Sequence, residues 1–242
     1  MRESILHILF VWYPYVCLTV FLLGSLVRFE REQYSWRAGS SQFLRRRQLV
    51  WGSNLFHGGI LFLFVGHAVG LLMPKSLYTL FVTVEQKQML AIVAGGMAGI
   101  VCFIGLTMLL HRRLSEPRIR QTSTRMDIAL LVLLWVQLVL GLVSIPHSLS
   151  HPDGSVMLVL SHWAQGILTL QPIDTAALGA LSWPYLLHLV LGMTLFLLFP
   201  FSRLVHIWSA PVWYLGRTGY QVVRRRQGPS RSARGAPPAA AE

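Results

Sequence analysis

Four histidines lie inside two long apolar stretches, where an ionisable side chain is costly and usually has a function. His57 and His67 belong to the first stretch, residues 49–73. His188 and His206 belong to the second, residues 183–208. A neutral imidazole is an axial ligand of haem iron, and iron between two imidazoles suits electron transfer rather than oxygen binding. Two apolar segments with two histidines each are the minimum protein part of a di-haem b-type cytochrome, and this is the chemistry that we expect.

The spacing of the histidines predicts one ligand pair near each boundary of a membrane. His188 and His206 are eighteen residues apart. In a straight helix this is five turns, so both imidazoles share one face at a separation of about 27 Å, close to the hydrocarbon thickness of about 30 Å. His57 and His67 are only ten residues apart, which gives about 15 Å of rise and a rotation of about 80°. Helix tilt, an offset between the haem planes or a kink at Pro200 would each absorb this mismatch.

The composition is that of an integral membrane protein. Hydrophobic residues make up 54% of the 242 residues and charged ones only 12%, and the charges gather between apolar runs. The net charge of +12 comes from nineteen arginines and two lysines against nine acidic residues. Most arginines flank apolar segments, where lipid head groups and orientation signals account for them. We therefore expect a lipid bilayer, and no nucleic acid, as the partner of these charges.

Five segments are apolar and long enough to cross a bilayer. They are residues 5–27, 49–73, 89–110, 128–145 and 185–207. We expect an all-α membrane protein with five transmembrane helices, a di-haem domain over residues 1–215, and a cytoplasmic tail, residues 216–242. The tail is rich in Arg, Pro and Ala, which predicts disorder. A sixth apolar segment, Ser155–Leu170, is only about three-quarters of a span, and we interpret it as an interfacial or re-entrant helix on the outer side.

The distribution of positive charge predicts the orientation in the membrane. Six arginines follow the first span, five follow the third and six lie in the tail. Two lysines follow the second span, and no Lys or Arg lies between the fourth and the fifth. The N-terminus is therefore expected outside and the C-terminus in the cytoplasm. In this orientation His67 and His188 form an outer pair of haem ligands, and His57 and His206 form an inner pair.

A haem-free alternative is a transporter that uses the histidines as a proton relay. No predicted span contains paired Asp or Glu residues, which argues against such a relay. Two pairs of histidines at matching depths on antiparallel helices also favour haem ligands over four unrelated histidines.

Four cationic side chains lie where they would border the two haems. Arg37, Arg112 and Arg203 are near the inner boundary, where each is able to pair with a haem propionate. Snorkelling of these arginines to lipid head groups is an equal alternative. Lys87 follows the outer end of the second span, in a predicted loop over residues 74–88. A quinol head group needs hydrogen-bonding groups near a haem edge, although charge alone favours a lysine that marks the membrane edge.

Motifs along nearly the whole chain resemble those of a known family. They are YPY at Tyr13–Tyr15, QYSWRAGSSQ at Gln33–Gln42, SNLFH at Ser53–His57, FVGH at Phe64–His67, RRLSEPRIR at Arg112–Arg120, HPDGS at His151–Ser155 and LHLVLGMTLFLLFPFSRLVHIWSAPVWYL at Leu187–Leu215. On these residues, up to about Tyr220, the chain resembles the gamma subunit of membrane-bound respiratory nitrate reductase, a di-haem cytochrome b. The tail after Gln221 departs from the family's shorter end.

The resemblance implies two haem b groups whose iron ligands are the four histidines, with His67 and His188 on the outer haem. It also implies that Lys87 belongs to the site of the quinol, menaquinol or ubiquinol, that donates electrons. The electron path would run from quinol through the outer and inner haems to an iron–sulfur beta subunit and a molybdenum-containing alpha subunit, which reduces nitrate in the cytoplasm of a prokaryote. The same kind of di-haem, quinol-linked subunit serving a different reductase or a hydrogenase stays an alternative.

Overall fold

The computed structural model describes residues 1–32 and 44–209, and every regular element in these two ranges is a helix. Five helices are long and apolar enough to cross a membrane. The first is Arg2–Glu32, which joins α1 (Arg2–His7), η1 (Ile8–Trp12) and α2 (Tyr13–Glu32). The others are α3 (Arg46–Leu72), α5 (Val84–Ser115), α7 (Arg125–Leu149) and α10 (Trp183–Leu198) with the following turn η3 (Phe199–Phe201). The predicted all-α fold with five spans is confirmed. Arg37 and the tail predicted over residues 216–242 lie outside the described residues.

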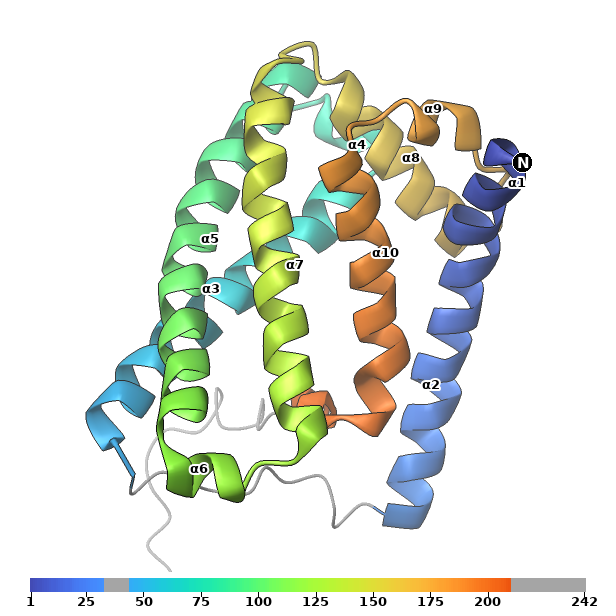
Figure 1. The fold of residues 1–242 in the computed structure, drawn as a ribbon. Helices are drawn as coiled ribbons and strands as arrows, with labels where there is room; N and C mark the ends of the chain where they lie inside the picture. Colours follow the sequence, from blue (N-terminus) through green and yellow to red (C-terminus); the bar gives the residue numbers. More distant parts are fainter. Residues whose placement is uncertain (33–43, 210–242) are drawn as a thin grey trace, which may run out of the picture. The chain divides into compact units, whose positions relative to one another are not determined.

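The long helices pack in a chain of neighbours. α3 packs against α5, α5 against α7, α7 against α10, and α10 against α2 (Figure 1). Three of the predicted haem ligands lie on α3 (His57 and His67) and α10 (His188), and these two helices are thus joined through α5 and α7.

Short helices lie at both ends of the long ones. α4 (Lys75–Tyr78), α8 (Ser155–Thr169) and α9 (Thr175–Gly179) lie at the end where α1 (Arg2–His7) begins, and α6 (Pro117–Gln121) lies at the opposite end (Figure 1). α8 is the sixth apolar segment of the sequence. Its fifteen residues are not among the five candidate spans, as predicted, and it packs against α3.

Glycines let the backbones of α3 and α5 approach closely. A Cβ atom added at Gly105 would lie 2.8 Å from the carbonyl oxygen of Gly52, and one added at Gly59 would lie 2.8 Å from the main-chain nitrogen of Cys102. Real Cβ atoms do not come so close to backbone, so any larger residue would push the two helices apart. This contact holds α3, and with it His57 and His67, in a defined register against α5.

Two helices begin earlier than predicted because polar residues cap them. Thr83 accepts a hydrogen bond from the main-chain nitrogen of Gln86 at 3.2 Å, and the Gln86 side chain accepts one from the nitrogen of Thr83 at 3.0 Å. Such a capping box satisfies backbone donors at a helix start. α5 therefore begins at Val84 instead of residue 89, and α7 begins at Arg125 after a similar box. Lys87 consequently lies in the first turn of α5, and its prediction in a loop is wrong.

The fifth predicted span is wrong in its last third. α10 ends at Leu198, a 3₁₀ turn covers Phe199–Phe201, and a second 3₁₀ segment, η4, covers Arg203–Ile207. Ser202 between them is extended, with φ −121° and ψ −179°. Pro200 has no backbone N–H with which to continue the hydrogen-bond ladder of an α-helix, which explains why the regular helix ends here. The argument that His188 and His206 share one face of a straight helix therefore fails.

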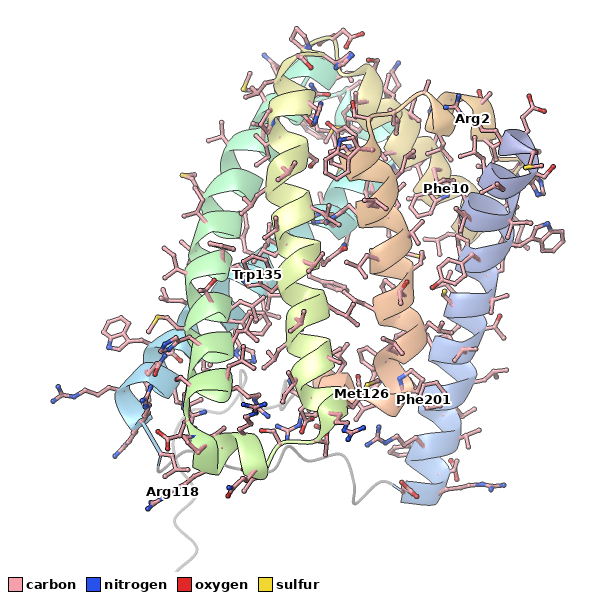
Figure 2. The ribbon with its side chains drawn as sticks, viewed as in Figure 1. Arg2, Phe10, Arg118, Met126, Trp135 and Phe201 are labelled. Atoms are coloured by element: carbon pink, nitrogen blue, oxygen red, sulfur yellow. The ribbon has the colours of Figure 1, made fainter. Side chains whose placement is uncertain are left out.

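Arginines gather at one end of the described helices. Figure 2 shows Arg118 at the α6 end and Arg2 at the opposite end, beside α9. Arg45 pairs with Glu116 at 3.2 Å near that α6 end, and Arg113 lies 3.9 Å from Asp127. This matches the asymmetry in the sequence, and the assignment of the α6 end to the cytoplasm stays a prediction.

Candidate functional site

The fold brings two of the predicted ligands, His67 on α3 and His188 on α10, together. The centroids of their rings are 6.2 Å apart and their planes are inclined by 31°. Two imidazoles that bind one metal ion through nitrogen, each at about 2 Å, have ring centroids about 6 Å apart. The geometry of the predicted outer pair therefore fits two ligands on opposite sides of one iron.

His188 is held by two residues of α7. Its Nδ1 donates to the main-chain oxygen of Gln137 at 3.0 Å, and the Gln137 side-chain amide donates to the main-chain oxygen of His188 at 3.1 Å. One turn further along α7, a Cβ added at Gly141 would lie 3.1 Å from Cε1 of His188. The imidazole thus rests on the bare backbone of Gly141, with Nδ1 bonded to the neighbouring turn and Nε2 3.3 Å from the side-chain nitrogen of Gln137. Neither Gln137 nor Gly141 is identifiable from the sequence alone, because nothing in its pattern pairs them with His188.

All four predicted ligands use Nδ1 in the same way. Each Nδ1 contacts a main-chain carbonyl oxygen: that of Ser53 for His57 at 2.8 Å, of Leu63 for His67 at 2.7 Å, of Gln137 for His188 at 3.0 Å and of Arg203 for His206 at 2.5 Å. A carbonyl only accepts, so Nδ1 carries the hydrogen and the lone pair of the neutral ring is on Nε2. This is the state of a metal-binding histidine. His151, outside the candidate spans, makes the same kind of contact, so the contact fits a ligand but does not identify one.

His57 and His206 reach their places in different ways. His57 lies in the regular part of α3, is exposed and has its ring next to Phe56. His206 lies in the 3₁₀ segment after the break in α10 and is also exposed. The pairing of these two residues on one iron stays a prediction.

The glycines near the ligands divide into two groups. A Cβ added at Gly58, Gly66 or Gly70 of α3 would meet nothing within 4 Å, which fits a flat group lying against this helix. A Cβ added at Gly192 would instead lie 3.2 Å from the side-chain nitrogen of Gln137. Gly192 therefore allows α10 to approach α7.

Lys87 is buried against an aromatic ring. Its side chain is 8% exposed, and Nζ lies 3.7 Å from the ring centroid of Tyr78, which is 4% exposed. Among the described residues neither Nζ of Lys87 nor the hydroxyl of Tyr78 has a hydrogen-bond partner. A buried ammonium without an acceptor is unfavourable, and the cation–π contact offsets only part of this. Burial, and then the charge of Glu85, raise the pKa of Tyr78, so the phenol stays protonated.

Two of the three arginines that were predicted to pair with haem propionates bind other groups of the protein instead. Arg203 forms an ion pair with Asp127, with Nη2 donating to Oδ2 at 2.9 Å. Arg112 is 2% exposed and donates to the main-chain oxygen of Leu44 at 2.7 Å. Arg37 lies outside the described residues. Asp127 was not predicted as a site residue, although the spacing from Thr124 to Asp127 is a capping-box signal.

Comparison with known proteins agrees with these features. The family model described as nitrate reductase gamma subunit matches residues 6–226. The chain is 52% identical over 214 residues to the respiratory nitrate reductase 1 gamma chain of Escherichia coli K12. The matched region covers 88% of this chain and 95% of that relative. It is 51% identical to the respiratory nitrate reductase 2 gamma chain of the same organism, over 89% of this chain and 95% of that one. It is 36% identical to the nitrate reductase gamma chain of Bacillus subtilis 168, over 88% and 95%.

Proposed function

The chain belongs to the family of nitrate reductase gamma subunits, and from this membership we propose that it is the di-haem cytochrome b subunit that oxidises quinol for a respiratory nitrate reductase. Its five apolar helices make it a multi-pass membrane protein. Its relatives make it a subunit of an oxidoreductase in a bacterial inner membrane. The reduction of nitrate itself would occur on a partner subunit.

His67 and His188 would hold the outer haem, and His57 and His206 the inner one. When bound, the two haems would supply one-electron transfer across the membrane. The observation that carries this proposal is the 6.2 Å separation of the His67 and His188 rings. These residues are 121 positions apart in the sequence (188 − 67) and lie on helices that pack mainly against other neighbours. The hydrogen bonds at Nδ1 would keep each Nε2 aimed at iron.

Lys87 would bind the quinol head group at the end of the protein where α4 lies. Oxidation of a quinol to a quinone releases two electrons and two protons. The ammonium of Lys87 would stabilise the anion that forms when the first proton leaves. Support comes from its burial and from its lack of an acceptor among the described residues, because a quinol oxygen would supply that acceptor. With this end outside, both protons would be released outside while the electrons move inward.

The α6 end would face the catalytic partners in the cytoplasm. The partners would be an iron–sulfur beta subunit and a molybdenum-containing alpha subunit, as the family membership suggests. The concentration of arginines at this end supports its cytoplasmic location through the positive-inside rule.

The experiment that tests the haem assignment uses the complete membrane complex. A pyridine haemochrome assay should give two b haems per chain. His67→Ala and His188→Ala should each remove the same haem signal, and His57→Ala and His206→Ala should each remove the other. Loss of one and the same haem in the His57 and His67 variants would overturn the pairing.

A further inference from the structure

An ion-pair cluster around the buried carboxylate of Asp127 joins three elements at the α6 end. Asp127, in the first turn of α7, is 7% exposed. Its carboxylate accepts hydrogen bonds from Nη2 of Arg203 and from the main-chain nitrogen of Thr124, both at 2.9 Å, and lies 3.9 Å from Nη1 of Arg113 on α5. The second carboxylate oxygen also contacts Nε of Arg203. The same aspartate therefore caps α7 and receives the guanidinium of Arg203 side-on through two nitrogens.

The cluster holds the irregular segment that follows α10. The break at Pro200 and Ser202 leaves carbonyl groups without helical donors, and such groups need other partners. Nη1 of Arg28, on α2, donates to the main-chain oxygens of Pro200 at 2.6 Å and Ser202 at 3.1 Å. Arg203, which follows Ser202, attaches the segment to α7 through its contact with Asp127. The segment is thus attached to α2 on one side and to α7 on the other.

A half-open pocket lies beside these polar contacts. A cavity of about 180 Å³ is lined by the start of α7 and by the segment after α10, including Met126, Asp127, Phe201 and Arg203. Met126 and Phe201 lie at the same end of the helices in Figure 2. The segment is packed elsewhere, since Ser202 is 4% and Val205 2% exposed.

Arg203 connects Asp127 to His206. The Arg203 side chain binds Asp127, and its main-chain oxygen accepts the hydrogen bond from Nδ1 of His206. A shift of Arg203 would move the carbonyl that orients the imidazole, as well as the turn that carries it.

We propose that Asp127 is a positioning residue for the inner haem, and that it acts by fixing Arg203 and thereby His206. The proposal rests on the assignment of His206 as an iron ligand under the proposed function. It gives Arg203 a role in holding its own segment, in place of direct pairing with a haem propionate. Asp127 is 7% exposed, so loss of Arg203 would leave its carboxylate with only the more distant Arg113, at 3.9 Å, as a charged neighbour, which is unfavourable.

The test compares Asp127→Asn, Arg203→Gln and the double variant in the complete membrane complex. We measure the b haem content, the two low-spin iron signals and the rate of haem release on warming. Asp127→Asn keeps an acceptor for the cap on α7 but removes the charge. Each single variant is expected to release the inner haem about tenfold faster, a change of about 1.4 kcal/mol, and to keep the outer haem. The double variant is expected to be no worse than either single one, because both residues act through one contact.

The matched control is Arg45→Gln, which removes the more exposed pair with Glu116 at the same end and should leave both haems unchanged. Asp127→Glu retains the charge and should therefore release the inner haem more slowly than Asp127→Asn does. Normal retention of the inner haem in Asp127→Asn would overturn the proposal, and so would loss of both haems, which would mean a general stabilising role. Loss of the inner haem in Arg203→Gln but not in Asp127→Asn would show that Arg203 binds the haem directly. A His206→Ala variant that keeps both haems would instead refute the ligand assignment itself.

Discussion

The contact between Gly141 and His188 leads to a prediction that separates haem binding from stability of the fold. The substitution is Gly141→Ala, which adds one methyl group in the middle of α7. The new Cβ would lie 3.1 Å from Cε1 of His188, whereas carbon atoms in ordinary contact are about 3.5–4.0 Å apart. The imidazole would therefore have to move by a few tenths of an ångström.

The size of the effect follows from what such a movement disturbs. The His188 ring is held at 3.0 Å from the Gln137 carbonyl oxygen and at 6.2 Å from the His67 ring. Ligand distances at metal sites are defined to about 0.2 Å, so the displacement would strain the bond to iron. Overpacking of this kind costs about 1–3 kcal/mol, which corresponds to outer haem binding weakened by roughly 5- to 150-fold. Alanine in place of glycine within a helix contributes about 0.5–1 kcal/mol in the opposite direction, so the helix itself should not be destabilised.

The assay measures the outer and inner haem signals and the release of each haem on warming, in the purified complex. Gly141→Ala should lose the outer haem selectively while the inner haem and the assembly are retained. Gly95→Ala on α5 is the matched control, because a Cβ there would meet nothing within 4 Å. If Gly141→Ala keeps the outer haem with its spectrum and release rate unchanged, then His188 is not held against this glycine in the way the structure describes.

Other substitutions test the quinol site and the orientation. Lys87→Ala should keep both haems reducible by dithionite but lose their reduction by quinol; reduction at the parent rate would make Lys87 an interfacial anchor only. Tyr78→Leu should raise the KM for quinol by about tenfold through loss of the cation–π contact, whereas Tyr78→Phe keeps the ring and should stay near the parent value. Reporter fusions after residues 40 and 120 should report the cytoplasm, and one near Pro152 should report the outside. A cytoplasmic signal near Pro152 would contradict the proposed orientation.

The structure also explains where predictions from the sequence stop being accurate. The first residues of α5 and α7 were predicted too late in the sequence because the prediction followed apolar residues. Polar capping residues determine where a helix begins. Lys87 was expected in a loop for this reason. The break after Leu198 was harder to predict, since the residues on both sides of Pro200 are apolar and a proline inside a membrane helix produces either a kink or an end.

By itself, the sequence determined the number of spans and the all-α class, and it singled out four histidines inside or beside the spans as candidate ligands. These properties depend on apolar length and on the cost of an ionisable group in lipid, and both can be evaluated one segment at a time. Only the tertiary structure decided that His67 and His188 face each other, that Gly141 supports His188, that Tyr78 covers Lys87 and that Asp127 binds Arg203. Each of these contacts joins residues from different helices or from a helix and a loop. No local pattern encodes them, because they depend on how the helices pack and on which side chains meet between them.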